Sequence, residues 1–290
     1  MFGILFFGSA LLAISVALYS LYRNHKAEYR WGVLRLKSRG LLPELSWPDV
    51  ARSLVTRCDD WPAERLAHPK QEFDGGLVLY ETPIGEIAAT PAHRRTIGLL
   101  VIEQLRGVYQ RGNVTVRNGD IVLDLGAHLG TFSRFALSRG AAKVVAFEPE
   151  PAHFNALQLT FQKEIREGRV HLINAAAWSE EGSLQFEASG LTSHLAESGP
   201  TRVRATTVDA IVASLNLDRV DFIKADIEGA ERHAVRGATQ TISRFQPRMA
   251  LCIYHLPDDP TVIRDAVKSL GDYRAFTNPG RTQAFFIPEA

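Results

Sequence analysis

Apolar runs alternate with segments of helical spacing through the second half of the chain, from residue 121 onward. Short apolar runs bounded by turn residues are typical of buried strands, and apolar residues repeating every three or four positions are typical of helices. The expected strands are residues 121–125, 144–147, 170–173, 220–225 and 249–253, with further extended segments near 183–186, 203–207, 273–276 and 284–287. Strands that alternate with helices imply right-handed crossovers. The pattern therefore predicts an α/β fold with a mainly parallel sheet and helices on both faces.

The first third of the chain is less regular. Residues 94–109 have helical spacing, and residues 77–80 read as a strand followed by a turn. Four prolines interrupt the earlier part of residues 27–94: Pro43, Pro48, Pro62 and Pro69. We interpret this segment as a helical cap or linker that precedes the main domain at 95–290.

Residues 2–22 contain no charged side chain, and about 20 apolar residues suffice to cross a bilayer as a helix. Basic residues follow this run, with one acid, Glu28, among them: Arg23, Lys26, Arg30, Arg35, Lys37 and Arg39. Positive charge collects on the cytoplasmic side of a membrane span. A cleaved signal peptide would instead begin with basic residues. We therefore expect residues 1–26 to be a single-pass transmembrane anchor, with the domain that follows in the cytoplasm.

The composition narrows the classes of function. A chain of 290 residues can hold one sizeable α/β domain with an appendage. The net charge of +1 lacks the basic excess of a dedicated nucleic-acid binder, so we expect no nucleic-acid partner. Cys58 and Cys252 lie far apart without ligand spacing, which argues against a disulfide framework or a zinc site.

The candidate chemistry centres on the glycine turn that follows the strand at 121–125. Asp124, Gly126 and Gly130 lie at its carboxyl end, where ligands of open α/β sheets bind. The pyrophosphate-binding fingerprint has a third glycine, and a carboxylate at Asp124 would repel a pyrophosphate but suit an ammonium group. This disfavours an NAD-dependent oxidoreductase and points to S-adenosyl-L-methionine. Glu148, at the end of the next strand, can accept hydrogen bonds from ribose hydroxyls.

With these motifs the chain resembles the FkbM family of S-adenosylmethionine-dependent methyltransferases. The matching segments are VLDLGAHLGTFS at 122–133, VAFEPEP at 145–151, TVD at 207–209, FIKADIEGAE at 222–231 and IYH at 253–255. The resemblance covers about residues 95–290 and leaves the segment before them outside. It implies a class I methyltransferase, Rossmann-like fold, usually with a seven-stranded sheet, and commonly O-methylation.

The resemblance also implies cofactor contacts. The residues expected at the methionine end are Asp124, Gly126, Ala127 and Gly130. Glu148 would hold the ribose, with Pro149 shaping the adjacent turn. Asn174 and Ala175 follow the third strand, where such folds contact adenine, and an ordinary turn role for Asn174 is an equal alternative.

Four residues are candidates for the methyl-transfer step. Asp226 ends a strand at the same sheet edge as the glycine turn. Lys224 lies in an apolar strand and should pair with a carboxylate, Asp226 or Glu228, because an unpaired buried ammonium is costly. His255 is a candidate base for an alcohol acceptor, with a structural role as the alternative. We expect no resident metal, although Asp226, Glu228 and His255 could together bind a divalent ion.

These patterns predict a membrane-anchored O-methyltransferase acting on a hydroxyl of a small-molecule, saccharide or lipid acceptor. One alternative is a catalytically silent methyltransferase-like scaffold held at a membrane to bind a partner. An NAD-dependent oxidoreductase is a further, weaker alternative. The sequence does not predict the acceptor or the oligomeric state.

Overall fold

The computed structural model describes residues 25–55, 63–187, 194–196 and 201–289. Among these residues, no helix combines the length and the apolar character needed to span a membrane. The apolar run at 2–22, for which the sequence predicts an anchor, lies outside the described residues. The anchor therefore stays a prediction.

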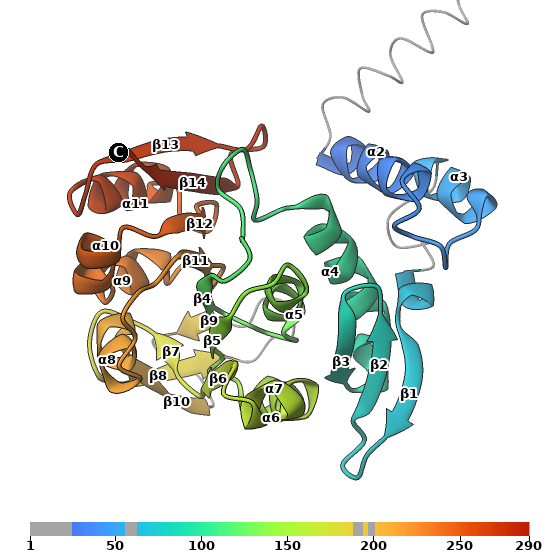
Figure 1. Cartoon of the computed structure of the whole chain (residues 1–290), viewed down its shortest axis with the longest axis horizontal. Coiled ribbons are helices and arrows are strands. Elements are labelled where there is room, and N and C mark those ends of the chain that lie inside the picture. The colour runs from blue at the N-terminus through green and yellow to red at the C-terminus, as the bar shows by residue number, and fades with distance from the viewer. Residues whose placement is uncertain (1–24, 56–62, 188–193, 197–200, 290) are drawn as a thin grey trace, which may run out of the picture.

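A seven-stranded sheet forms the centre of the protein (Figure 1). Its strands are β4 (Ile121–Leu125), β5 (Lys143–Phe147), β6 (Val170–Ile173), β11 (Phe222–Ala225), β12 (Arg248–Cys252), β13 (Tyr273–Thr277) and β14 (Gln283–Pro288). Their order is β13-β14-β12-β11-β4-β5-β6. The pairs that β14 forms with β13 and β12 are antiparallel, and the other four pairs are parallel. The predicted α/β fold with a mainly parallel seven-stranded sheet is confirmed.

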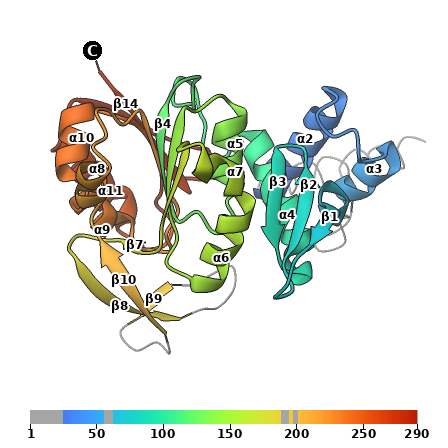
Figure 2. The ribbon, with the colours of Figure 1, turned by 60° about the horizontal axis from the view of Figure 1, so that its bottom comes forward.

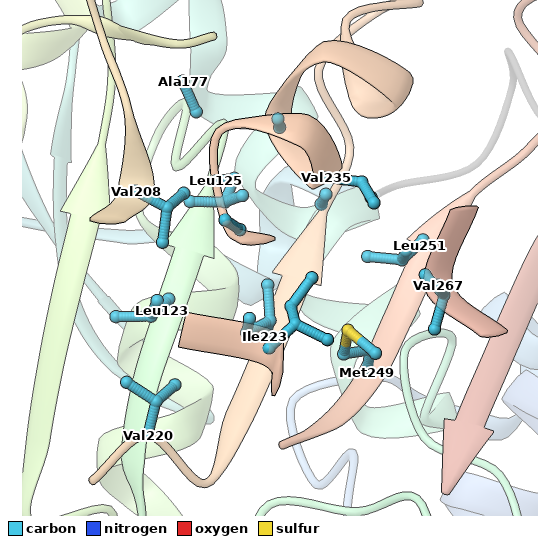
Figure 3. Close-up of a cluster of buried hydrophobic side chains, with 14 of the residues drawn as sticks. Leu123, Leu125, Ala177, Val208, Val220, Ile223, Val235, Met249, Leu251 and Val267 are labelled. Carbon is cyan, nitrogen blue, oxygen red and sulfur yellow. The ribbon is translucent and has the colours of Figure 1, made fainter. Parts of the chain in front are cut away.

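Helices cover both faces of this sheet, as Figure 2 shows. One face carries α5 (Thr131–Ser138), α6 (Pro151–Thr160) and α7 (Gln162–Arg166), and the other carries α8 (Val208–Ser214), α9 (Glu231–Arg236), α10 (Thr239–Phe245) and α11 (Asp259–Lys268). Because strand residues alternate between faces, Leu123 and Leu125 pack in the cluster with Val208 and Val235 (Figure 3). Val122 faces α5 instead. Asp124 follows the same alternation and points toward α5.

A smaller sheet lies beyond the carboxyl end of β6. Its strands, in the order β7-β10-β8-β9, are β7 (Ala176–Ala177), β10 (Thr201–Thr206), β8 (Gly182–Glu187) and β9 (His194–Ala196). β7 begins immediately after Ala175, and β10 leads into α8. The extended segments predicted at 183–186 and 203–207 are therefore confirmed as strands of a separate sheet.

The segment before the main sheet contains more than the predicted helical cap. Its helices are α2 (His25–Ser38), α3 (Trp47–Val55), the short η2 (Ala63–Leu66) and η3 (Pro91–His93), and α4 (Arg94–Arg106). Between them, β1 (His68–Glu72), β2 (Val78–Thr82) and β3 (Gly85–Ala89) form a three-stranded antiparallel sheet. The strand predicted at 77–80 is confirmed as β2. The helical cap was incomplete, because β1 and β3 show no clear apolar run.

This segment packs directly on the main domain. The backbone N–H of Ala88 in β3 donates to the hydroxyl of Thr160 in α6 at 2.8 Å. Arg134 in α5 donates through Nε to the carbonyl of Glu86 at 3.1 Å and makes a buried ion pair with Glu164 at 2.5 Å. These contacts hold α4 beside the glycine turn, so residues before the methyltransferase motifs reach the ligand-binding edge of the main sheet.

Candidate functional site

A cavity of about 180 Å³ lies at the carboxyl ends of β4, β5 and β11. Among its lining residues are Gly126, Ala127, His128, Glu148, Pro149, Ala175, Lys224, Asp226 and Glu228, together with Leu100, Gln104 and Tyr109 from α4 and the segment after it. Ligands of open α/β sheets bind at this edge. The structure thus brings most of the predicted site residues together, and it adds a wall from the N-terminal region.

The turn after β4 requires glycine at position 126. Gly126 has a φ of +80°, and a Cβ added there would lie 2.2 Å from the carbonyl oxygen of Asp226. The N–H groups of Gly126 and Ala127 both donate to the carbonyl of Phe147, at 3.1 and 2.9 Å. Glycine therefore lets the end of β4 lie between β5 and β11, with the backbone facing the cavity.

Gly130 has a different role from the one predicted. It has a φ of +76° and precedes α5, and it does not line the cavity. A Cβ there would lie 2.7 Å from Leu157 of α6 and equally close to Phe161. The second glycine of the turn therefore allows α5 and α6 to pack closely, and its contact with a cofactor is not supported by its position.

Asp124 and Lys224 form a fully buried ion pair beneath the cavity. Lys224 Nζ lies 3.0 Å from Asp124 Oδ1, and Asp124 also accepts a hydrogen bond from Ser133 at 2.6 Å. The two residues are direct neighbours in the register of β4 and β11. Although burial lowers the pKa of Lys224, the Asp124 carboxylate raises it above the usual value. The prediction that Lys224 pairs with Asp226 or Glu228 was wrong, and Asp124 does not line the cavity.

Lys224 also fixes the glycine turn and contributes charge to the cavity wall. Its ammonium donates to the carbonyls of Gly126 at 2.6 Å and Leu125 at 3.2 Å. It also lies 5.4 Å from the centre of the Tyr109 ring. Together with the Asp124 carboxylate, these two carbonyls take up the three N–H donors of the ammonium group. The sequence argument expected the Asp124 carboxylate to face an ammonium group of the cofactor, but in the structure it faces the ammonium group of Lys224.

Glu148 presents a buried carboxylate at the end of β5. It accepts hydrogen bonds from the backbone N–H groups of His128 at 2.7 Å and Glu150 at 2.9 Å, one on each oxygen. Burial raises the pKa of Glu148 to about 7, although both backbone donors act to lower it. Each oxygen keeps a lone pair for a further donor, as ribose hydroxyls would provide.

Pro149 and Ala175 line the same part of the cavity, whereas Asn174 does not. The Asn174 amide donates to the carbonyls of Glu148 at 2.9 Å and Pro149 at 3.4 Å. It therefore ties the end of β6 to the end of β5, which is the turn role left open by the sequence. Of the two residues predicted near adenine, Ala175 is the one in contact with the cavity.

Asp226 and Tyr109 also line the cavity, and they are hydrogen-bonded to each other. The Tyr109 hydroxyl donates to Asp226 Oδ2 at 2.5 Å, and burial raises the pKa of this hydroxyl well above its usual value. Tyr109 was not predicted as a site residue, because the apolar spacing around it is that of an ordinary packed helix. Gln104 and Leu100 of α4 were missed for the same reason.

His255 follows β12 and lies beside three carboxylates. Its Nε2 is 3.3 Å from Glu228 and 3.8 Å from Asp226, and its Nδ1 is 3.1 Å from Glu231. Burial lowers the pKa of His255, but the carboxylates of Glu228 and Glu231 outweigh it and raise this pKa to about 10. A free base for an alcohol would need a pKa nearer neutrality, so the surrounding carboxylates do not favour that predicted role for His255.

The family model of the methyltransferase FkbM domain matches residues 124–273 of this chain. That range runs from the buried Asp124 to the start of β13 and contains the strand ends that form the cavity. The chain belongs to the FkbM methyltransferase family. The family suggested by the sequence motifs is thus confirmed, and with it a class I methyltransferase-like fold.

Two named methyltransferases are similar in sequence to this FkbM-family chain. The hexuronic acid methyltransferase AglP of Haloferax volcanii is 25% identical over 162 residues, covering 54% of this chain and 64% of that protein. The 31-O-demethyl-FK506 methyltransferase FkbM of Streptomyces tacrolimicus is 43% identical over 63 residues, covering 21% of this chain and 24% of that protein. This chain thus matches less than two thirds of the length of either relative.

Among solved structures, methyltransferase FkbM from Methylobacillus flagellatus KT is similar to this chain at a TM-score of 0.49 and 16% identity. The superposition covers 91% of this chain and 62% of that chain.

Proposed function

We propose that the protein is an S-adenosyl-L-methionine-dependent methyltransferase that methylates a hydroxyl oxygen. The observation that carries the proposal is the cavity at the ends of β4, β5 and β11, which joins the buried Glu148 carboxylate to the Lys224 ammonium across the Gly126 turn. When bound there, the cofactor supplies an electrophilic methyl group on its sulfonium. The protein supplies positioning and charge.

The residues of the cavity fit the parts of this cofactor. Glu148 would accept hydrogen bonds from the ribose hydroxyls, and Ala175 with Pro149 would leave a flat apolar surface for adenine. Gly126 and Ala127 would line the methionine end, and Lys224 would hold the glycine turn in place through the Gly126 carbonyl. In this proposal Asp124 acts through Lys224, which it holds in place.

Asp226 and Glu228 line the cavity with partly exposed carboxylates, so we assign them to the transfer step. The names of the two relatives, one for a hexuronic acid and one for 31-O-demethyl-FK506, support an oxygen acceptor on a saccharide or a natural product. A saccharide or lipid-linked acceptor would also fit the predicted anchor.

The test combines calorimetry with a transfer assay on the full-length protein. We expect binding of S-adenosyl-L-methionine and no binding of NAD, followed by transfer of a labelled methyl group to a component of membrane or cytosolic extracts. NAD binding without S-adenosyl-L-methionine binding would overturn the proposal. Cofactor binding with no labelled product in any extract would instead favour the scaffold alternative.

The affinity for S-adenosyl-L-methionine should rise with pH through about 7, the pKa of Glu148. Hydroxyl donors stabilise the ionised carboxylate, so binding competes with protonation and weakens by up to about tenfold per pH unit below that value. Calorimetry between pH 5.5 and 8.5 measures the effect. The Glu148→Gln variant should bind more weakly, with a flat profile. The pKa of buried Glu103 is also raised to about 7. If the affinity of Glu148→Gln still rose with pH, the pH dependence would come from Glu103 or another group and not from Glu148.

Residues 2–22 should hold the full-length protein in the membrane fraction during an alkaline carbonate wash, because about 20 apolar residues can span the bilayer. A variant that starts at residue 25 should be released by the same wash. Release of the full-length protein would remove the anchor from the proposal without affecting the proposed chemistry.

A further inference from the structure

Three potential metal ligands from two strand ends converge beside the cavity. Asp226 and Glu228 follow β11, and His255 follows β12. One ligand atom from each lies within 4.8 Å of the others. Asp226 and Glu228 also line the cavity, with side chains 25% and 29% exposed, so the cluster is open to a ligand on that side.

The spacing of these atoms matches the coordination shell of a small divalent cation. At metal–oxygen distances of about 2.1 Å, neighbouring ligands of an octahedron lie roughly 3 Å apart and opposite ligands roughly 4 Å apart. His255 Nε2 lies 3.3 Å from Glu228 Oε2 and 3.8 Å from Asp226 Oδ1. One ion can therefore contact all three side chains after only small movements.

The environment of His255 is that of a metal ligand. Its side chain is only 9% exposed, and its Nδ1 faces the fully buried carboxylate of Glu231 at 3.1 Å. That carboxylate is held by the backbone N–H groups of Ile227 at 2.9 Å and Gly229 at 3.0 Å. Histidines that bind metals usually direct the second ring nitrogen to a carboxylate, and Glu231 lies on that side of the His255 ring.

The cluster also leaves polar atoms unsatisfied. Asp226 Oδ1 and both ring nitrogens of His255 are buried, and none of these atoms has a hydrogen-bond partner of acceptable geometry among the described residues. A proton on Nε2 points in one direction, whereas an ion between the side chains can contact both carboxylates and the nitrogen together. Buried polar atoms without partners indicate a missing ligand.

We propose that Asp226, Glu228 and His255 bind a divalent cation of the Mg²⁺ or Mn²⁺ class, which holds the acceptor beside the cofactor. Two carboxylate oxygens and one imidazole nitrogen leave three octahedral positions for water or acceptor oxygens. This inference rests on the proposed function and narrows it to acceptors with two neighbouring oxygens, such as a vicinal diol or a hydroxy acid.

The cation would activate the acceptor hydroxyl, with His255 serving as a ligand of the ion in its neutral form. A hydroxyl bound to the ion has a lowered pKa and releases its proton to water. The oxygen then forms a bond to the methyl carbon, while the carbon–sulfur bond breaks and its electron pair passes to sulfur. The sulfonium charge and the oxyanion charge cancel in the products.

A second cluster in the same protein provides a matched control. Glu148, Glu150 and His153 also place ligand atoms within 4.8 Å of one another. There, however, both oxygens of Glu148 accept backbone N–H groups, and His153 Nδ1 contacts Glu150 at 2.9 Å. We expect no cation to bind at this cluster.

The experiment is a titration of the full-length protein with Mn²⁺ alone, followed through the electron paramagnetic resonance signal of the free ion. We expect one ion per chain, displaced by Mg²⁺. Glu228→Gln and His255→Gln should each weaken Mn²⁺ binding at least tenfold, and Glu150→Gln should leave it unchanged. Glu228 is partly exposed, so its substitution should leave the fold intact.

Calorimetry with S-adenosyl-L-methionine on the same variants separates the two proposals. Cofactor binding without Mn²⁺ binding would overturn the metal site and leave the proposed function standing. A loss of Mn²⁺ binding in Glu150→Gln, with none in Glu228→Gln, would also overturn it. Mn²⁺ binding without cofactor binding would support the metal site and count against the proposed function.

Discussion

The Lys224→Met variant should lose about 3–5 kcal/mol of unfolding free energy, the usual cost of leaving one partner of a buried ion pair uncompensated. Lys224 and Asp124 are both buried, with side chains 5% and 0% exposed. Methionine fills a similar volume, but among the residues that the structure describes it leaves the Asp124 carboxylate with only the Ser133 hydroxyl as a donor. It also releases the Gly126 carbonyl, which Lys224 holds at 2.6 Å. Urea unfolding of the full-length protein measures the loss.

Two controls separate this charge effect from a loss of packing. Lys163 is 73% exposed, and its contact with Glu167 at 3.9 Å is a surface pair, so Lys163→Met should change stability by less than about 1 kcal/mol. Adding Asp124→Asn to Lys224→Met removes the uncompensated charge and should restore a large part of the lost stability. Equal losses in the single and double variants would show that the ion pair does not stabilise the fold.

The same pair shows how far the sequence can specify this site. The apolar run of β11 revealed that Lys224 is buried, and burial required a carboxylate partner. Alternation along the strand placed Asp226 on the same face, but the actual partner is Asp124, which lies opposite Lys224 only because β11 adds beside β4. Which residues are neighbours across a sheet depends on the order of the strands. The residue pattern within a single strand does not predict that order.

The glycine turn was predictable to a similar extent. A strand followed by glycines predicted a ligand-binding edge, and Gly126, Ala127 and Glu148 do line the cavity. Gly130 instead packs on Leu157, because its place in the turn is set by the crossing of α5 and α6. Tyr109 could not be predicted as a site residue, since it reaches Asp226 from a part of the chain with no recognisable motif.

The Gly126→Ala variant should bind S-adenosyl-L-methionine at least about 100-fold more weakly, because small displacements of positioned groups have effects of this size. The new methyl group would lie 2.2 Å from the carbonyl oxygen of Asp226 and 2.8 Å from the side chain of Ile227. Relief of that clash must move β4 away from the end of β11. The movement would shift Asp226 and the Lys224 ammonium together. Calorimetry measures the loss of affinity, and urea unfolding should show about 2–5 kcal/mol of destabilisation.

Gly119 is the matched control for this substitution. It has a φ of +86°, close to that of Gly126, but a Cβ built there meets no atom within 4 Å. Gly119→Ala should therefore carry only the left-handed backbone cost of about 1–2 kcal/mol and leave cofactor affinity unchanged. Suppose that both variants lost the same unfolding free energy and that neither lost cofactor affinity. Backbone strain alone would then explain the destabilisation of both variants. The close approach of β4 to Asp226 would then have no part in cofactor binding, and the cofactor would have to bind away from the glycine turn.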